Sequence, residues 1–206
     1  MVSGLVGRNI LAVGAHPDDV ELGCYGTLAK LAKKNTIKVL VLTNGEDGGT
    51  NRTQETKAAF KDIGEVQVLD FPSGYLVANG VTVEAVRAVA TGCDMVFTQT
   101  GWDTHQDHRA VEGIVLAAVR RRPVTVLGYH IISSTPAFPV NVIVDIKNEY
   151  DRKVDALKCH KSQAGRTYIS PDFLRVWHME KMATAVGLEC VELFHLYQSF
   201  WTQNAS

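Results

Sequence analysis

The chain alternates short apolar runs with longer segments in which apolar residues recur at helical spacing. The runs have strand length and are rich in β-branched residues; residues 36–43 (TIKVLVLT) are nearly continuous in apolar character. Such runs are typical of strands that are covered on both faces. Strands are expected at 10–14, 36–43, 66–71, 94–99, 124–129, 140–146 and 190–197, the last as an edge strand.

The segments between the runs predict helices. In residues 27–33 the apolar side chains fall on one face. The next helix begins near Arg52 and ends at Gly64, because glycine is favoured just after a last helical turn. Further helices are expected at 82–91, 107–121, 149–160 and 172–185. The residues expected in the core are Leu28, Leu31, Val39, Val41, Val96, Ile114 and Val144.

Strands that alternate with helices indicate βαβ units with right-handed crossovers. We therefore expect an α/β fold, with a Rossmann-like, mostly parallel sheet flanked by helices on both faces. The length of 206 residues fits a single domain over residues 1–206 that buries enough surface to need no disulfides.

Composition and charge exclude several classes of function. The net charge of −1 gives no electrostatic reason to expect nucleic acid or an anionic membrane as a partner. The four cysteines are far apart and form no C-x-x-C pair, which excludes a cysteine zinc knuckle and favours reduced thiols. No glycine-rich nucleotide-binding motif occurs. The N-terminal apolar stretch lacks a cationic segment and is too short to span a membrane, so we expect a cytoplasmic protein.

Two polar loops follow expected strands at the edge of the sheet where α/β folds bind ligands. The first loop, His-Pro-Asp-Asp at 16–19, comes shortly after strand 10–14. The second, Trp-Asp-Thr-His-Gln-Asp-His at 102–108, comes after strand 94–99. Because the carboxyl ends of parallel strands meet at one edge, we expect these loops, roughly 90 residues apart in sequence, to face one another.

The residue types in the two loops are those of a metal site. Read separately, each loop is ordinary turn chemistry, in which an aspartate caps a helix and the histidines are solvated. Read together, they place His16, His105 and His108, from a total of seven histidines, beside carboxylates, which favours one shared site. Two imidazoles and one carboxylate with an open fourth position describe catalytic zinc, and iron(II) accepts the same ligands. Calcium and magnesium would prefer mostly oxygen ligands.

The loops hold more acid and imidazole groups than three ligands require. Zinc lowers the pKa of a bound water to about 7, so hydroxide is available to attack a carbonyl carbon. The attack needs a base for the proton of the water and a donor for the oxyanion or leaving group. One aspartate of the Asp18/Asp19 pair and one histidine of the His105/His108 pair are free for these roles, and Asp107 can orient His105. The residues alone do not decide which aspartate is the ligand.

Four stretches of the chain together carry a family resemblance. They are AHPDD (15–19), NRTQETKAAFKDIG (51–64), DTHQDH (103–108) and the segment 144–163, which contains VDI and ends in SQ. In type and order they resemble the motifs of the LmbE/PIG-L family of zinc-dependent N-acetylglucosaminyl deacetylases, and the likeness runs from about residue 10 to about residue 165. Gln106 stands where proline is usual and Tyr25 where glycine is frequent, and neither change removes a ligand.

The resemblance implies an enzyme that removes an acyl group, usually acetyl, from the nitrogen of an amino sugar. It implies three zinc ligands, His16, Asp19 and His108. Asp18 would then be the general base, and His105 would stabilise the oxyanion or protonate the leaving amine, with Asp107 behind it. Relatives often assemble as trimers or hexamers, so a homo-oligomer is a further expectation.

Residues outside the metal loops are candidates for substrate binding. Glu46 and Arg52 lie in or beside a glycine-rich loop at the same edge of the sheet. Arg52 either contacts substrate or forms a surface ion pair with Glu55 or Asp47, worth under about 1 kcal/mol. Trp102 either stacks on a sugar ring or anchors its own loop. The remaining histidines, expected to be structural or solvated, are His130, His160, His178 and His195.

The sequence leaves three functions open. The leading hypothesis is a metal-dependent hydrolase that removes the N-acetyl group from a small N-acetylglucosamine-type substrate. An amidase for a larger sugar amide conjugate would use the same centre, because pocket shape decides the substrate. A non-catalytic zinc-containing sugar-binding protein is disfavoured, because structural zinc sites are closed by four ligands and this sequence keeps a spare acid and imidazole.

Overall fold

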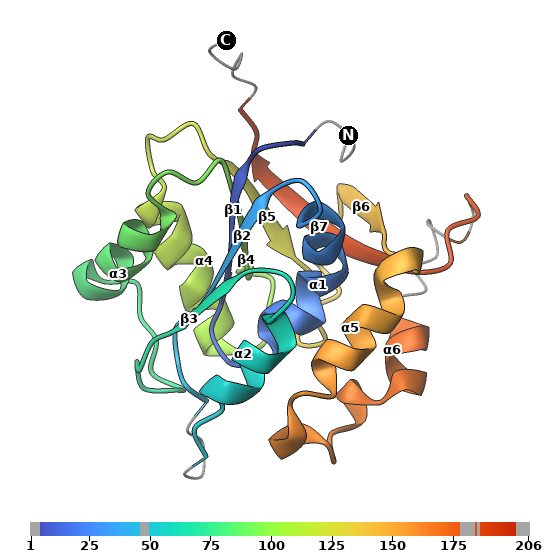
Figure 1. Cartoon of the computed structure of the whole chain (residues 1–206). Helices are drawn as coiled ribbons and strands as arrows, with labels where there is room; N and C mark the ends of the chain where they lie inside the picture. Colours follow the sequence, from blue (N-terminus) through green and yellow to red (C-terminus); the bar gives the residue numbers. More distant parts are fainter. Residues whose placement is uncertain (1–4, 46–49, 178–183, 185, 201–206) are drawn as a thin grey trace.

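The computed structural model, which describes residues 5–45, 50–177, 184 and 186–200, contains one seven-stranded sheet in the order β3-β2-β1-β4-β5-β7-β6 (Figure 1). Strands β1 to β5 run parallel, and β7 pairs antiparallel with both β5 and β6. The predicted mostly parallel α/β sheet is therefore confirmed. The strands are β1 (Asn9–Gly14), β2 (Thr36–Val41), β3 (Glu65–Val68), β4 (Met95–Thr98), β5 (Thr125–Tyr129), β6 (Val142–Asp145) and β7 (Val191–Gln198).

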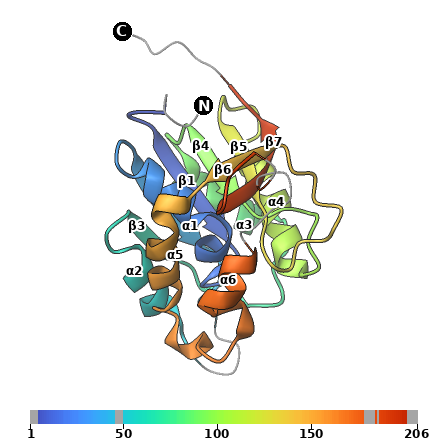
Figure 2. The same ribbon diagram turned by 90° about the vertical axis from the view of Figure 1, so that its right-hand side faces the viewer.

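Helices cover both faces of the sheet (Figures 1 and 2). One face is covered by α3 (Gly80–Ala90) and α4 (Gln106–Ala118), which pack on each other. The other face carries α1 (Asp19–Leu31), α2 (Thr53–Phe60), α5 (Tyr150–Leu157) and α6 (Pro171–Trp177). Three short 3₁₀ turns, Lys147–Glu149, Lys161–Gln163 and Thr167–Ile169, flank α5 and lead to α6.

Each central strand buries both of its faces, which explains the near-continuous apolar runs. On β1, Ile10 and Ala12 enter the core beneath α1, whereas Leu11 and Val13 enter the core beneath α3 and α4. All seven residues that the sequence placed in the core are buried. The four cysteines are free thiols, as expected. Among the described residues, no helix is long and apolar enough to cross a membrane.

Two expectations about element positions were wrong. The strand expected at 190–197 is not an edge strand: β7 lies between β5 and β6, and β6 forms the edge. The first helix begins at Asp19 rather than near residue 27, because α1 is buried on almost every side and its first turns show no single apolar stripe. The helix expected at 172–185 includes α6, and most of its second half lies outside the described residues.

Gly23 allows α1 to approach the sheet closely. A Cβ atom at this position would lie 2.1 Å from Cδ2 of Tyr129, a ring whose hydroxyl donates to the Val13 carbonyl in the core. We expect Gly23→Ala to lower the free energy of unfolding by about 1–3 kcal/mol through overpacking, despite the better helix propensity of alanine. Gly113→Ala in α4 is the control, because its Cβ would meet only Ala78 at 3.5 Å. Equal urea midpoints for the two variants would contradict this interpretation.

Candidate metal centre

The first polar loop follows β1 directly and turns into α1 at Asp18, which adopts a left-handed backbone with φ of 102°. The Asp18 carbonyl accepts from the Leu22 amide at 2.9 Å and so begins the helix. The Asp19 carboxylate accepts the His16 backbone N–H at 2.7 Å, which holds this side chain beside the His16 ring. The strained turn thus gives the two neighbouring aspartates different partners.

The second polar loop ends where α4 begins, and it meets the first loop as predicted. His105 is the N-cap of α4, and its Nδ1 accepts from the Asp107 backbone N–H at 3.1 Å. In the first turn of α4, His108 Nε2 lies 3.3 Å from His16 Nδ1 and 3.3 Å from Asp19 Oδ1. The expected meeting of loops from the ends of β1 and β4 is therefore confirmed.

The geometry of three side chains fits a divalent cation. His16 Nδ1 lies 3.3 Å from Asp19 Oδ2, His108 Nε2 lies 3.3 Å from the other oxygen of Asp19, Oδ1, and the two ring nitrogens are 3.3 Å apart. Ligands about 2.0–2.1 Å from a tetrahedral zinc lie about 3.3 Å from one another. One ring nitrogen from each of His16, His105 and His108 also lies within 4.8 Å of the other two, so His105 is an additional potential ligand.

In both His16 and His108, the second ring nitrogen contacts a carboxylate. His16 Nε2 lies 2.9 Å from Asp107 Oδ2, and His108 Nδ1 lies 3.1 Å from Asp103 Oδ2. Ser133 Oγ donates to the same Asp103 oxygen at 2.9 Å. Histidine ligands of metals commonly use the second ring nitrogen in this way, which fixes the tautomer and the ring orientation. The contacts explain why the loops carry more carboxylates than ligation requires.

Asp107 was expected to orient His105, but the Asp107 carboxylate does not contact His105. That carboxylate contacts His16, and only the Asp107 backbone amide reaches His105. The carboxylate is itself held by the backbone amides of Gly74, at 2.6 Å, and Leu76, at 3.1 Å. Sequence analysis missed both amides and Ser133, because a backbone donor or a lone serine carries no recognisable signal.

The centre has a strongly negative field. Although burial opposes protonation, Asp107 and Asp19 raise the pKa of His16 to about 9. Burial also opposes protonation of His108, but Asp19 and Asp103 outweigh it and raise the pKa of His108 to about 10. Surroundings that favour a positive charge on two buried imidazoles also favour a cation between them.

We expect Asp107→Asn to weaken zinc binding by about 10- to 100-fold, because the variant keeps the shape but removes the charge that orients His16. Competition with a chromophoric chelator measures the zinc affinity. Asp62→Asn, a change at an exposed carboxylate on another surface, is the control and should not change the affinity. Unchanged zinc affinity in Asp107→Asn would contradict the assignment of His16 as a ligand oriented by Asp107.

The carboxylate of Asp18, the residue next to Asp19, pairs with Arg52. Arg52 Nη2 lies 2.7 Å from Asp18 Oδ2, and Arg52 Nε lies 3.6 Å from Glu55 Oε2. Burial raises the pKa of the Asp18 carboxyl to about 6, and the Arg52 charge opposes that rise. The guanidinium of Arg52, expected at the substrate or in a surface ion pair, is buried against Asp18. Glu46, the other candidate of that loop, lies outside the described residues.

Residues of segments 51–64 and 144–163, the two other motif segments, form a network next to Arg52. The Glu55 carboxylate accepts from the Ser162 amide at 2.8 Å and from its hydroxyl at 2.6 Å. His160 is fully buried, with Nε2 2.7 Å from Glu21 Oε1 and Nδ1 3.8 Å from Glu55 Oε2. Segments 51–64 and 144–163 are thus joined where they support Asp18. Of the two expectations for His160, structural or solvated, its burial excludes the solvated one.

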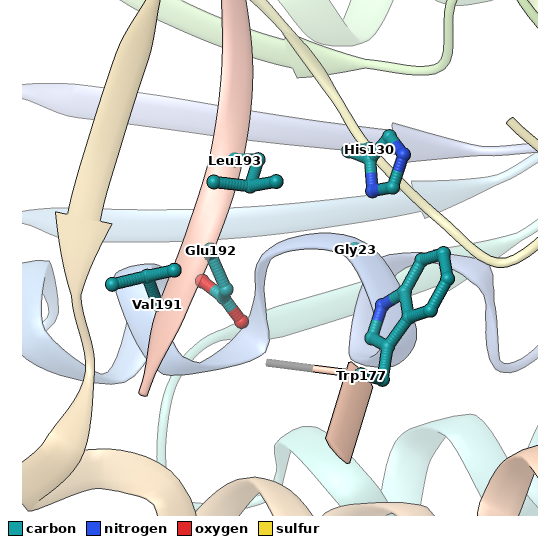
Figure 3. Close-up of a pocket in the computed structure, with 6 residues that line it drawn as sticks. All are labelled: Gly23, His130, Trp177, Val191, Glu192 and Leu193. Carbon is teal, nitrogen blue, oxygen red and sulfur yellow. The ribbon is translucent and has the colours of Figure 1, made fainter. Parts of the chain in front are cut away.

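Aromatic rings flank the centre on the β7 side. Trp102 contacts the rings of Phe138, His195 and Tyr197, with centroids 6.5, 4.9 and 6.1 Å away, contacts that favour the loop-anchoring role over sugar stacking. His130 stacks on Trp177 with centroids 4.9 Å apart. Figure 3 shows these two side chains across a small pocket from three β7 residues.

Comparisons with known proteins identify the family of the chain. Residues 11–119 match the family described as PIG-L, GlcNAc-PI de-N-acetylase. The chain is 38% identical over 170 residues to the uncharacterized deacetylase YaiS of Escherichia coli K12, an alignment that covers 75% of this chain and 91% of YaiS.

Solved structures share the fold at lower identity. GalB, the 4-carboxy-2-hydroxymuconate hydratase of Pseudomonas putida KT2440, superposes with a TM-score of 0.79 at 17% identity, covering 97% of this chain and 100% of GalB. The N,N'-diacetylchitobiose deacetylase of Pyrococcus horikoshii superposes with a TM-score of 0.76 at 19% identity, covering 92% and 83% of the two chains. Because the family match includes both metal loops and spans more than half of the sequence, the chain belongs to the PIG-L family of deacetylases.

Proposed function

We propose that this protein is a zinc-dependent hydrolase that removes the N-acetyl group from an N-acetylglucosamine-type sugar. The observation that carries the proposal is the separation of roles between two adjacent carboxylates. Asp19 lies 3.3 Å from ring nitrogens of both His16 and His108, whereas Asp18 pairs with Arg52. A ligand set with a spare buried acid beside it suits hydrolysis better than a purely structural metal.

The side chains divide the chemistry between them. His16, Asp19 and His108 would hold a divalent cation, which when bound would supply a Lewis acid for the amide carbonyl and for the attacking water. Asp18 takes the proton of the attacking water on its carboxylate. The Arg52 guanidinium, 2.7 Å away, fixes the orientation of that carboxylate. A base whose pKa lies near 6 is largely ionised at neutral pH and still accepts a proton effectively.

His105 is suited to donate a hydrogen bond from Nε2. Its Nδ1 accepts the Asp107 amide, so the proton of the neutral ring resides on Nε2. Burial and the neighbouring histidines lower the pKa of His105, which favours the neutral ring at pH 7. The Nε2–H then donates a hydrogen bond to the oxyanion, and the proton that Asp18 took from water passes to the amine as the C–N bond breaks and acetate leaves.

The sugar part of the proposal rests on family membership and on the deacetylases with the same fold, one of which acts on N,N'-diacetylchitobiose. The test is acetate release by the zinc-loaded protein from N-acetylglucosamine, its glycosides and N,N'-diacetylchitobiose. We expect release from at least one of these substrates and its loss after zinc is removed with a chelator.

Other outcomes would assign a different function. Release of a longer acyl group from a larger sugar amide, without release of acetate, would identify the amidase alternative. Sugar binding without hydrolysis would indicate a non-catalytic protein. A zinc-loaded protein that releases no acyl group from any of these amides would overturn the proposal.

A further inference from the structure

The first polar loop begins where β1 and β4 stop pairing. β1 lies between β2 and β4 in the sheet (Figure 1), and the paired residues of β1 and β4 end at Ala12 and Phe97. On its other side, β1 stays paired with β2 as far as Gly14 and Val41. The strand order changes direction between β1 and β4, and such a switch point opens a crevice at the carboxyl edge of a parallel sheet.

The side chain of Gln99 joins the two strands beyond this point. Gln99 follows β4 directly, and its Oε1 accepts the Ala15 backbone N–H at 2.9 Å. The Ala15 carbonyl accepts from the backbone amide and the hydroxyl of Thr43, just beyond β2, at 3.0 and 2.9 Å. Ala15 is therefore hydrogen-bonded to residues at the ends of both neighbouring strands, and Gln99 supplies the bond on the β4 side.

The burial of Gln99 is costly for the fold. The residue is 1% exposed, and its Nε2 has no hydrogen-bond partner among the described residues. A buried amide donor without a partner destabilises the folded state, whereas an apolar side chain of similar size would avoid that cost. Features that oppose stability in this way occur mainly at functional sites. The bond from Oε1 to Ala15 indicates what the function of Gln99 is.

That bond fixes the backbone next to a proposed metal ligand. Ala15 immediately precedes His16, and the His16 backbone N–H donates to Asp19 Oδ2 at 2.7 Å. Two successive amides of the loop are thus held, one by Gln99 and the next by Asp19. Because His16 Nδ1 lies 3.3 Å from His108 Nε2, a displacement of the backbone at Ala15 would change the separation of these two ring nitrogens.

From this placement we propose that Gln99 is a positioning residue for the metal centre. It acts through the Ala15 amide and holds the backbone of His16 where the His16 and His108 rings can bind one cation together. The inference rests on the proposed role of His16 as a ligand, and it adds a residue that lies outside the two polar loops. A side chain that keeps the position of a ligand in this way affects metal affinity although it is not itself a ligand.

The test compares the zinc affinities of Gln99 variants with that of the wild-type protein, by competition with a chromophoric chelator. Gln99→Leu has a similar volume but no acceptor for the Ala15 amide, so we expect zinc binding to weaken about tenfold. Gln99→Glu should retain at least the wild-type affinity, because a carboxyl group accepts that amide in either protonation state. Gln99→Asn, whose side chain is one methylene shorter, withdraws the acceptor and should weaken binding as Gln99→Leu does, which keeps the test valid if Gln99→Leu does not fold.

Asp94→Ala is the matched control, because it removes a bond of the same kind at the other end of the same two strands. Asp94 directly precedes β4, and its Oδ2 accepts the backbone N–H of Asn9, the first residue of β1, at 2.8 Å. We expect Asp94→Ala to unfold at a lower urea concentration than the wild-type protein and to bind zinc with unchanged affinity. A positioning role of Gln99 would thus be separated from a general contribution to the stability of the sheet.

Two outcomes would overturn the inference. One is a zinc affinity in Gln99→Leu and Gln99→Asn equal to that of the wild-type protein, and the other is an equal fall in affinity in Gln99→Leu and Asp94→Ala. The measurement uses no sugar, so it is independent of the proposed hydrolysis. A wild-type protein that releases no acetate, together with zinc binding that weakens in Gln99→Leu alone, would overturn the proposed function and leave the positioning role of Gln99 intact.

Discussion

Asp18→Asn is expected to bind zinc with one-to-one stoichiometry and yet to lose acetate release by about 10²- to 10⁴-fold. The reason is that the Asp18 carboxylate pairs with Arg52 rather than with the cluster formed by His16, Asp19 and His108. Asparagine keeps the shape and one acceptor for the guanidinium, but it cannot take a proton from water. Metal analysis of the purified variant and a coupled acetate assay measure the two quantities separately.

His16→Ala is the complementary variant and should lose stoichiometric zinc. It removes a ring nitrogen that lies 3.3 Å from both other ligand candidates, and it leaves Asp107 without the imidazole that it contacts. The pair of variants distinguishes a base from a ligand, because loss of activity accompanies loss of metal in only one of them. Zinc loss in Asp18→Asn, or near-normal acetate release by it, would remove Asp18 from the role of base.

The sequence predicted the part of the site that rests on strand order. Once the apolar runs are recognised as parallel strands, the loops after β1 and β4 must share an edge, and His16 meets His108 there. The contacts of Asp107 could not be predicted in the same way. Its partners are the His16 ring and two backbone amides of the β3–α3 segment, and which imidazole it reaches depends on side-chain rotamers at the start of α4.

The position of β7 in the sheet was predicted wrongly for a related reason. A C-terminal strand that alternates polar and apolar residues is typical of an edge, but β7 pairs with β6 and β5 on its two sides. One of its polar residues, Glu192, is 2% exposed and reaches α1. Glu192 is a polar residue of an internal strand because it takes part in a buried ion pair. The sequence alone could not distinguish it from a residue that faces solvent.

That ion pair leads to the largest expected effect on stability. Lys153 Nζ lies 2.6 Å from Glu192 Oε1 and donates to the Leu22 carbonyl at 2.7 Å, and both charged side chains are almost completely buried. The Glu192 carboxylate also accepts the Gly26 and Thr27 amides at 2.9 and 2.7 Å. In a regular helix the Gly26 amide donates to the Leu22 carbonyl. Glu192 contacts the first of these two groups and Lys153 the second, so the ion pair is bonded directly to the backbone of α1.

We expect Lys153→Met to lower the free energy of unfolding by about 3–5 kcal/mol, because it leaves the Glu192 charge buried without its partner. Lys158→Met is the matched control: Lys158 lies 2.9 Å from Asp155, but both side chains are mostly exposed, and an exposed pair contributes under about 1 kcal/mol. Urea unfolding monitored by circular dichroism measures both changes.

The double variant Lys153→Met/Glu192→Leu sharpens the test. It removes both charges and leaves the Gly26 and Thr27 amides and the Leu22 carbonyl without their charged partners, so we expect it to recover only part of the loss. Since α1 carries Asp18 and Asp19 at its N-terminal end, zinc affinity should fall together with stability in Lys153→Met and remain unchanged in Lys158→Met. Equal unfolding midpoints for the two single variants would show that the buried pair does not hold α1 in place.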